Sequence, residues 1–159
     1  MLIQVVGAFL GIMCVSVTYG VERKFFKFCG LCGASGWLVY LLLQRYTENT
    51  AVLVFCASSV VAFLAHILAR SLKSPVTVFL IPGILPLVPG LKLYRCVYNL
   101  IMAENDLASQ YFNLTLQSAG CIALAIFIMD TIFRILNQYL FPKRIKNGQV
   151  NTNQNDANG

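Results

Sequence analysis

The stretch Pro75-Val-Thr-Val-Phe-Leu-Ile-Pro-Gly-Ile-Leu-Pro-Leu-Val-Pro-Gly-Leu-Lys-Leu-Tyr94 decides how the chain folds. It is apolar enough for a lipid bilayer, yet it is interrupted at Pro82, Gly83, Pro86, Pro89 and Gly90. An interior proline removes a backbone donor and clashes with the carbonyl one turn earlier, so the stretch cannot be one regular helix. At membrane depth, irregular backbone is tolerated only where protein buries it or where it lines a wet cavity. The break therefore predicts a transport site.

Composition places the chain among integral membrane proteins. Its 159 residues are 58% hydrophobic and 11% charged, whereas soluble domains carry roughly 25% charged residues. With about 20 residues for each crossing, the chain has room for about four to six spans. This is small for a complete carrier, so we expect a partner or self-association. The Lys and Arg residues cluster at the ends of apolar runs, where they act as topology signals, and we expect no nucleic-acid partner.

The apolar segments predict an all-α, polytopic membrane protein with about five transmembrane helices, the fourth broken by the Pro/Gly motif. The predicted transmembrane domain covers residues 1–142, with spans at residues 2–19, 26–43, 50–69, 75–103 and 107–136. The first segment lacks a positive n-region and a small-x-small cleavage site, so we interpret it as a span and not as a signal peptide. Residues 143–159 turn basic and then polar, which predicts a disordered cytoplasmic tail.

The fourth span has two interpretations. As a helix, residues 75–87 rise only about 20 Å against roughly 30 Å of hydrocarbon, so the span needs a continuation. After Gly90, apolar residues share one helical face, while Lys92, Arg95 and Asn99 share another. We favour a broken span that continues to Ala103. The alternative places residues 91–103 in the membrane interface as an amphipathic helix.

The distribution of Lys and Arg predicts a protein of the cytoplasmic (inner) cell membrane with its N-terminus outside and its C-terminus inside. In this orientation the outer side holds Arg45 and, at most, Lys92 and Arg95. The cytoplasmic loops and tail hold the larger set, Arg23, Lys24, Lys27, Arg70, Lys73, Lys143, Arg144 and Lys146.

The restart of the helix after the break offers a binding site for a carboxylate. A helix that begins after Pro89 and Gly90 presents unpaired backbone amides and the positive end of its dipole. Lys92 and Arg95 follow within the next turn and add positive charge. The candidate substrate-binding residues are Pro86, Pro89, Gly90, Lys92, Tyr94, Arg95, Asn99, Asn113 and Gln117.

The polar members of this set also have structural interpretations. Lys92 and Arg95 can snorkel to the outer interface, and Tyr94 can belong to an interfacial aromatic belt. Asn113 and Gln117 stand one turn apart on the fifth span. Amides inside a membrane helix need partners, so we expect this face to meet protein or a cavity, and helix packing is its structural interpretation.

His66 and Asp130 are the candidates for carrying a coupling proton. Their structural interpretations are a hydrogen bond from His66 to a neighbour and an ion pair between Asp130 and Arg134, four residues apart. Cys29 and Cys32 form a C-x-x-C without a second pair or clustered His, so we interpret them as packing residues and expect no metal and no cofactor. The ionisable residues are scattered singly, which argues against an enzyme.

Stripes of small residues predict the faces on which helices pack closely. They comprise Gly7 and Gly11 on the first span, Gly30, Gly33 and Gly36 on the second, and Ser58, Ala62, Ala65 and Ala69 on the third. Some of these faces are expected to meet a partner subunit.

Residues Ser74 to Tyr94 read Ser-Pro-x-x-x-Phe followed by Ile-Leu-Pro-Leu-Val-Pro-Gly-x-x-x-Tyr. This pattern resembles the signature of the threonine/serine exporter family, specifically its short C-terminal-half subunit, and the glycine-rich segment Gly30–Gly36 is similar as well. The resemblance covers about residues 1–142. It implies a secondary exporter of small carboxylates, either threonine and serine or a dicarboxylate such as succinate, that needs a second, longer membrane subunit. The alternative is a non-transporting assembly or regulatory subunit, although a scaffold would not need the proline-glycine break.

Overall fold

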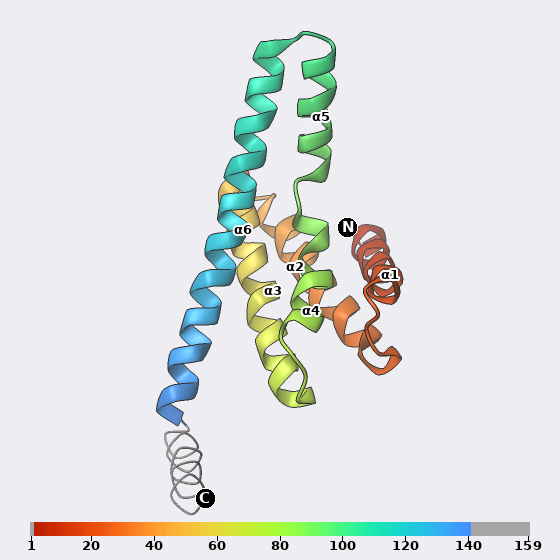
Figure 1. Ribbon diagram of the computed structural model, residues 1–159, viewed down its shortest axis with the longest axis vertical. Coiled ribbons are helices and arrows are strands. Elements are labelled where there is room, and N and C mark those ends of the chain that lie inside the picture. Colours follow the sequence, from red (N-terminus) through yellow and green to blue (C-terminus); the bar gives the residue numbers. More distant parts are fainter. Residues whose placement is uncertain (1, 141–159) are drawn as a thin grey trace, which may run out of the picture.

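The computed structural model describes residues 2–140, and the tail predicted at residues 143–159 lies outside them. The described chain consists of helices and the turns between them (Figure 1). The helices are α1 Leu2–Thr18, α2 Phe26–Leu43, α3 Thr50–Leu72, α4 Thr77–Ile84, α5 Gly90–Ile101 and α6 Asn105–Leu140, with short 3-10 helices η1 Arg23–Phe25 and η2 Leu85–Leu87. The prediction of an all-α fold is confirmed.

Three helices of the described chain are long and apolar enough to cross a membrane, namely Arg23–Leu43, Thr50–Leu72 and Asn105–Tyr139. The pair Thr77–Leu87 and Gly90–Ile101 passes the same test together, with a bend of 51° at the break. The predicted break in the fourth span is therefore present. At 17 residues, α1 rises only about 25 Å as a helix, so the total of five crossings stays a prediction.

Three glycines of α2, spaced three residues apart, face three different neighbours. A Cβ at Gly30 would approach an aromatic ring of α1 to 2.8 Å, and one at Gly36 would approach Val61 of α3 to 2.2 Å. Gly33 faces both α1 and α4. Because lipid supplies no hydrophobic drive for helix association, such close backbone approach is what holds helices together in a membrane. The small residues of α2 and the buried small residues of α3 are thus packing residues, as predicted.

The crossing of α2 with α4 uses the first glycine of the Pro/Gly motif. A Cβ at Gly33 would lie 2.2 Å from the Ile12 side chain and 3.0 Å from the carbonyl oxygen of Gly83. In the reverse direction, a Cβ at Gly83 would lie 3.0 Å from Val61 and 3.2 Å from the sulfur of Cys32. Gly83 therefore serves packing, because a side chain there would push α4 away from α2 and α3.

The two thiols of the C-x-x-C motif are buried and point to different helices. The Cys29 thiol donates to the carbonyl of Val78 on α4 at 3.3 Å, and the Cys32 thiol donates to the carbonyl of Val61 on α3 at 3.4 Å. Within residues 2–140, no three His, Cys, Asp or Glu side chains gather in a way that would hold a metal ion. These contacts support the interpretation of the motif as packing.

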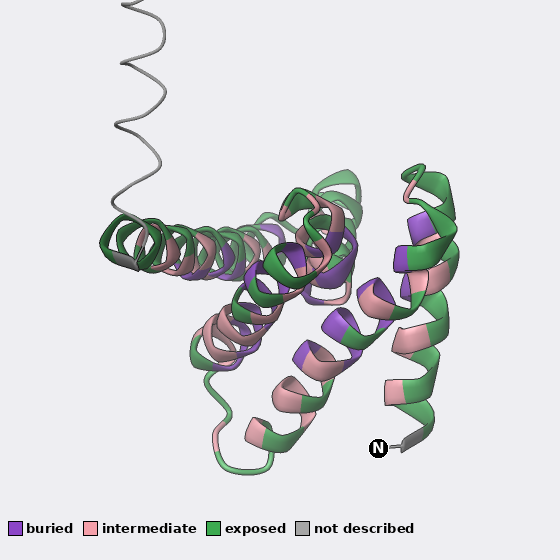
Figure 2. Cartoon of the chain, turned by 90° about the horizontal axis from the view of Figure 1, so that it is seen from below, coloured by how far each residue is buried: buried purple, intermediate pink, exposed green. Residues whose placement is uncertain are grey.

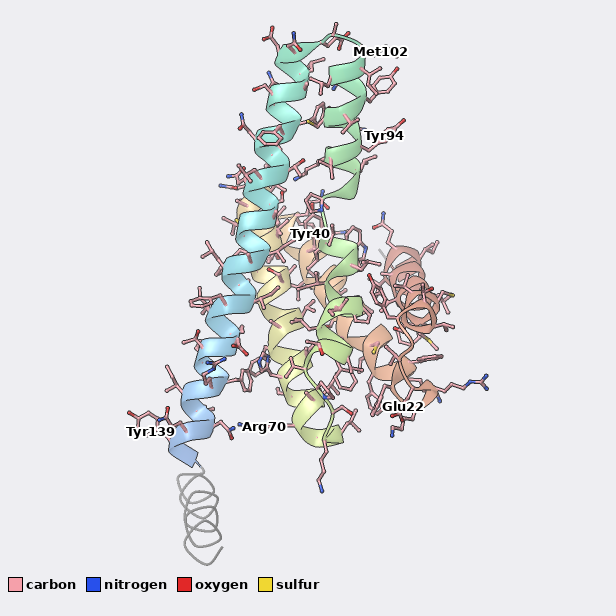
Figure 3. The ribbon with its side chains drawn as sticks, viewed as in Figure 1. Glu22, Tyr40, Arg70, Tyr94, Met102 and Tyr139 are labelled. Atoms are coloured by element: carbon pink, nitrogen blue, oxygen red, sulfur yellow. The ribbon has the colours of Figure 1, made fainter. Side chains whose placement is uncertain are left out.

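The basic loops lie at one end of the molecule. Figure 3 places Glu22, Arg70 and Tyr139 toward the lower end, with Met102 at the opposite end. Glu22, just before η1, and Arg70, near the end of α3, therefore lie toward the same end of the molecule, as the predicted topology requires. Which side of the membrane this end faces stays a prediction.

Helix α6 is longer than a bilayer is thick, and its two halves have different neighbours. Its 36 residues give a length of about 54 Å, against roughly 30 Å of hydrocarbon. The first half packs against α5 in an antiparallel hairpin that extends beyond the other helices, and the second half packs against α3 (Figure 1). Buried residues line the inward faces of the helices, whereas the outer faces are exposed (Figure 2).

Candidate functional site

The backbone leaves helical geometry between η2 and α5. Val88 is extended, with φ −62° and ψ 129°, and Pro89 caps the start of α5. A proline disfavours helical geometry in the residue before it, and it cannot donate a helical hydrogen bond itself. The pair Val88 and Pro89 therefore sets the break, and Gly90 begins the next helix.

The first turn of α5 carries two free backbone donors. The Gly90 amide donates to the Val88 carbonyl at 2.8 Å, and the Leu93 amide donates to the Pro89 carbonyl at 3.0 Å. Among the described residues, the amides of Leu91 and Lys92 have no acceptor. Free amides and the helix dipole make the start of a helix attractive to an anion.

A cavity of about 250 Å³ opens beside this turn. Helices α2, α3, α5 and α6, the short helix η2 and the break contribute to its walls, and Figure 3 shows Tyr40 close to the break. Trp37 and Tyr40 of α2 lie among the lining residues and stack on each other, with ring centroids 5.3 Å apart. The lining residues are Trp37, Tyr40, Thr50, Val54, Pro86, Leu87, Val88, Pro89, Leu91, Lys92 and Ser118.

Lys92 is a half-buried cation that has no anionic partner within residues 2–140. Its Nζ donates to the Ser118 hydroxyl at 3.0 Å, and that hydroxyl in turn donates to the Leu114 carbonyl at 2.8 Å. Ser118 is only 2% exposed. None of the ion pairs within residues 2–140 includes Lys92. A charge withdrawn from water and left without a counter-charge is costly, so the site favours binding of an anion.

The structure brings part of the predicted set together at this cavity. Pro86, Pro89 and Lys92 line it, and Gly90 lies between them in the first turn of α5. A Cβ at Gly90 would meet no atom within 4 Å. Unlike Gly83, Gly90 is thus surrounded by open space, and the approach to the free amides is clear.

The other predicted residues of α5 lie outside the cavity. Arg95 reaches the Tyr111 hydroxyl of α6 at 3.4 Å and lies 5.7 Å from the centre of that ring. Tyr94 is 64% exposed and faces outward beside Tyr98. Asn99 is half-buried on the side of α5 that carries Lys92. These three residues do not line the cavity.

Asn113 and Gln117 are exposed and lie away from the cavity. Neither side chain makes a hydrogen bond to any described residue. Ser118 lies about 100° around the helix from Gln117, on the face that carries Tyr111. Residues 2–140 therefore do not supply the protein or cavity that we expect the amide face to meet.

Helix α5 has its polar side inward and its apolar side outward. Lys92, Cys96 and Asn99 are half-buried, whereas Tyr94 and Ile101 are 64% and 75% exposed. In water this arrangement would be unfavourable, because apolar surface is exposed while a cation is withdrawn from solvent. An environment of lipid or of a partner protein stabilises a helix whose apolar side faces outward. Helix α5 also runs along α6, as a broken span would, and the crossing of the membrane by residues 91–103 stays a prediction.

Sequence reasoning missed Trp37, Tyr40 and Ser118, which complete the cavity. The aromatic pair belongs to a helix far from the break in sequence, and no local pattern links the two. Ser118 had a usable signal, because Tyr111, Thr115 and Ser118 place hydroxyls on one face of a helix. The interpretation relied instead on the side-chain amides of Asn113 and Gln117, which lie on another face of the same helix.

A second polar cluster joins α3 to the second half of α6. His66 Nε2 lies 3.4 Å from Asp130 Oδ1, and Arg134 lies 3.5 Å from the other carboxylate oxygen. One turn further along α3, Arg70 donates to the Asn137 side chain at 2.8 Å. The ion pair of Asp130 with Arg134 matches the structural interpretation of these residues, and the contact with His66 is new.

The match to a protein family covers most of the chain. Residues 4–132 match the family described as "Threonine/Serine exporter, ThrE". Comparisons with curated proteins and with solved structures found no match. The family match agrees with a helical protein that has several candidate spans and a helix pair bent at its Pro/Gly motif. The chain therefore belongs to the threonine/serine exporter family of multi-pass membrane proteins.

Proposed function

We propose that this chain is one subunit of a secondary transporter that exports small carboxylates across the cytoplasmic membrane. The carboxylate binds in the cavity at the break, between the first turn of α5 and the side chain of Lys92. A second, longer membrane subunit of the same family completes the transporter.

One observation carries this proposal: Lys92 has a hydroxyl partner and no anionic partner among the described residues. The free amides of Leu91 and Lys92 belong to the same turn. A carboxylate has two oxygens, so it can accept from an ammonium and from backbone amides together, and such charged hydrogen bonds are among the stronger ones. An ionisable residue inside a membrane segment is in general a sign of a functional site.

The cavity suits a small ligand with at least one carboxylate. Its volume of about 250 Å³ equals the share of about eight water molecules, at roughly 30 Å³ each. The lining includes a cation and three hydroxyl-bearing residues, Tyr40, Thr50 and Ser118, but no Asp or Glu. It is therefore better matched to a carboxylate than to the ammonium group of an amino acid. A cavity that suits a carboxylate better than an ammonium group favours a dicarboxylate such as succinate over an amino acid at the part of the binding site that this subunit supplies.

A second subunit would supply what this chain leaves open. Asn113 and Gln117 have no hydrogen-bond partner within residues 2–140, and amides in a membrane need one. Gly7 and Gly11 of α1 are exposed, with no atom within 4 Å of a Cβ at either position. A second subunit that packs on these faces would satisfy the amides and fill the glycine surface.

The test is efflux of labelled threonine, serine and succinate from cells that express this chain with its candidate partner. Lys92→Gln should lower efflux by about tenfold or more, because a charged hydrogen bond contributes roughly 1.5–3 kcal/mol. The loss should be larger for succinate than for the zwitterionic amino acids, because a doubly charged ligand depends more on fixed positive charge. Lys27→Gln, an exposed lysine near the basic end, is the matched control and should leave efflux unchanged.

Two results would contradict the proposal. If a Lys92→Gln variant still assembles with its partner and exports at the wild-type rate, the cavity is not the binding site. Full efflux by this chain purified alone into liposomes would show that no second subunit is required.

A further inference from the structure

The imidazole of His66 is held in a fixed orientation by α3 and α6. The side chain is buried, and its ring stacks on Phe133 with centroids 4.6 Å apart and planes 14° from parallel. Nδ1 lies 2.9 Å from the Ala62 carbonyl oxygen. A carbonyl oxygen can only accept a hydrogen bond, so Nδ1 carries a hydrogen in this contact.

The other ring nitrogen also faces an acceptor. Nε2 of His66 lies 3.4 Å from Oδ1 of Asp130. An ionised carboxylate only accepts, and a neutral ring with its hydrogen on Nδ1 has a lone pair at Nε2. These two groups would then present lone pairs to each other. One added proton, on Nε2 or on the carboxylate, turns the repulsion into a hydrogen bond.

The surroundings of the pair permit exchange of that proton with water. A cavity of about 280 Å³ reaches both residues. The charged groups that face the pair are Arg134 of α6, 3.5 Å from the Asp130 carboxylate, and Arg70 of α3, which is bonded to Asn137. The segment before α4 contributes Ser74 and Val76 to the cavity, and neither titrates. Asp130 is therefore the group placed to share a proton with His66.

We propose that His66 and Asp130 share one proton and form the proton-binding site of the transporter. When the pair carries the proton, α3 and α6 are joined. When the proton leaves to water, the two lone pairs repel each other and this contact between α3 and α6 is lost. Helix α6 also carries Ser118, the partner of Lys92, 12 residues or about 18 Å before Asp130. A shift of α6 therefore alters the carboxylate site, and this coupling rests on the proposed function.

The first experiment separates coupling from transport. The complex of this chain with its partner is placed in membrane vesicles, and labelled threonine, serine or succinate is followed with and without an imposed pH gradient. In the wild type, the gradient should accelerate net efflux. In His66→Gln and Asp130→Asn, the ratio of the two rates should fall to about one, while exchange of labelled for unlabelled substrate, which needs no net proton movement, continues. Asp106→Asn, an exposed carboxylate at the start of α6, is the matched control.

The outcomes distinguish the two proposals. No exchange in the wild-type complex with any of the three substrates would contradict the proposed function. Normal exchange with an unchanged gradient ratio in His66→Gln would overturn the proton site alone.

The second experiment needs no transport activity. The sequence contains one histidine, so full-length chain labelled with ¹⁵N-histidine in lipid nanodiscs gives signals from a single imidazole. The Nε2 signal should change when Asp130 is replaced by Asn and should stay in place in Asp106→Asn. The measurement is made over the pH range 5 to 8, where histidine side chains in general change charge. If the Nε2 signal is the same in the wild type and in Asp130→Asn throughout this range, the pair does not form in the membrane.

Discussion

The crossing of α2 with α4 and the hairpin of α5 with α6 both depend on glycines of the same chain, yet they use them in opposite ways. At the crossing, Gly33 and Gly83 leave no room for a side chain. In the hairpin, a Cβ at Gly90 or Gly120 would meet no atom within 4 Å. The first region is complete within this chain, whereas the second leaves surface and hydrogen-bonding groups open.

This difference separates the two halves of the Pro/Gly motif. Pro82 and Gly83 are buried and dock α4 on α2, so they position the break. Pro89 and Gly90 follow this packed segment and begin a helix in which the backbone amides of Leu91 and Lys92 are free. One motif thus builds a rigid support and an open site next to each other. Variants at Gly33 and Gly90 should show the contrast.

The largest effect is expected at the crossing. Gly33→Leu places a side chain against Ile12 and the backbone of Gly83. Overpacking of this kind typically costs about 1–3 kcal/mol, and more where backbone must move. We expect loss of folded protein, measured by size-exclusion chromatography in detergent and by thermal unfolding. Gly7→Leu on the exposed face of α1 is the control, and equal stability of the two variants would contradict the packing described here.

A smaller effect on folding and a large effect on transport are expected at the break. Gly90→Leu meets no atom within 4 Å at its Cβ, so insertion and folding should be retained. The new side chain would stand beside the free amides of Leu91 and Lys92, and efflux should fall by about tenfold or more if the carboxylate loses a charged hydrogen bond there. If a folded and assembled Gly90→Leu complex shows normal efflux, this part of the break has a structural role and does not bind the carboxylate.

An intermediate effect is expected on the outer face of the hairpin. Gln117→Leu removes an amide that has no hydrogen-bond partner among the described residues, so the stability of the folded chain by itself should be unchanged. If the second subunit bonds this amide, co-purification of the two subunits should fall several-fold, because one such bond in a membrane contributes about 0.6–2 kcal/mol. Leu116→Ala lies about 100° away around the helix and serves as the control. Unchanged co-purification would place the partner on another face.

The smallest effect is expected from Arg95. Its contact with Tyr111 is exposed and long, at 3.4 Å to the hydroxyl and 5.7 Å to the ring centre. Exposed cation–π contacts contribute about 0.5–1 kcal/mol, so Arg95→Gln should lower the stability slightly and change efflux by less than about twofold. Efflux as low as that of Lys92→Gln would extend the carboxylate site one turn along α5.

The sequence predicted much of the fold but less of the site. The apolar runs located α1, α2 and α3 to within about three residues at each end, as expected when each helix is close to a bilayer in length. Helix α6 was predicted at residues 107–136 and extends from Asn105 to Leu140. Among the residues that line the cavity, Pro86, Pro89 and Lys92 were candidates from the sequence because the break is local in sequence. Trp37 and Ser118 were not, because only the packing of α2 and α6 brings them to the break.

What the sequence determined by itself is the membrane class, the helical architecture and the existence of the break. These follow from composition and from the covalent chemistry of proline, which act without reference to the rest of the chain. Only the tertiary structure decided which glycine packs and which is open, that Lys92 has no anionic partner in the part of the chain that the structure describes, and that His66 faces Asp130 across 64 residues. The reason is physical: a distance between two helices depends on every side chain between them, and a sequence read segment by segment contains no such distance.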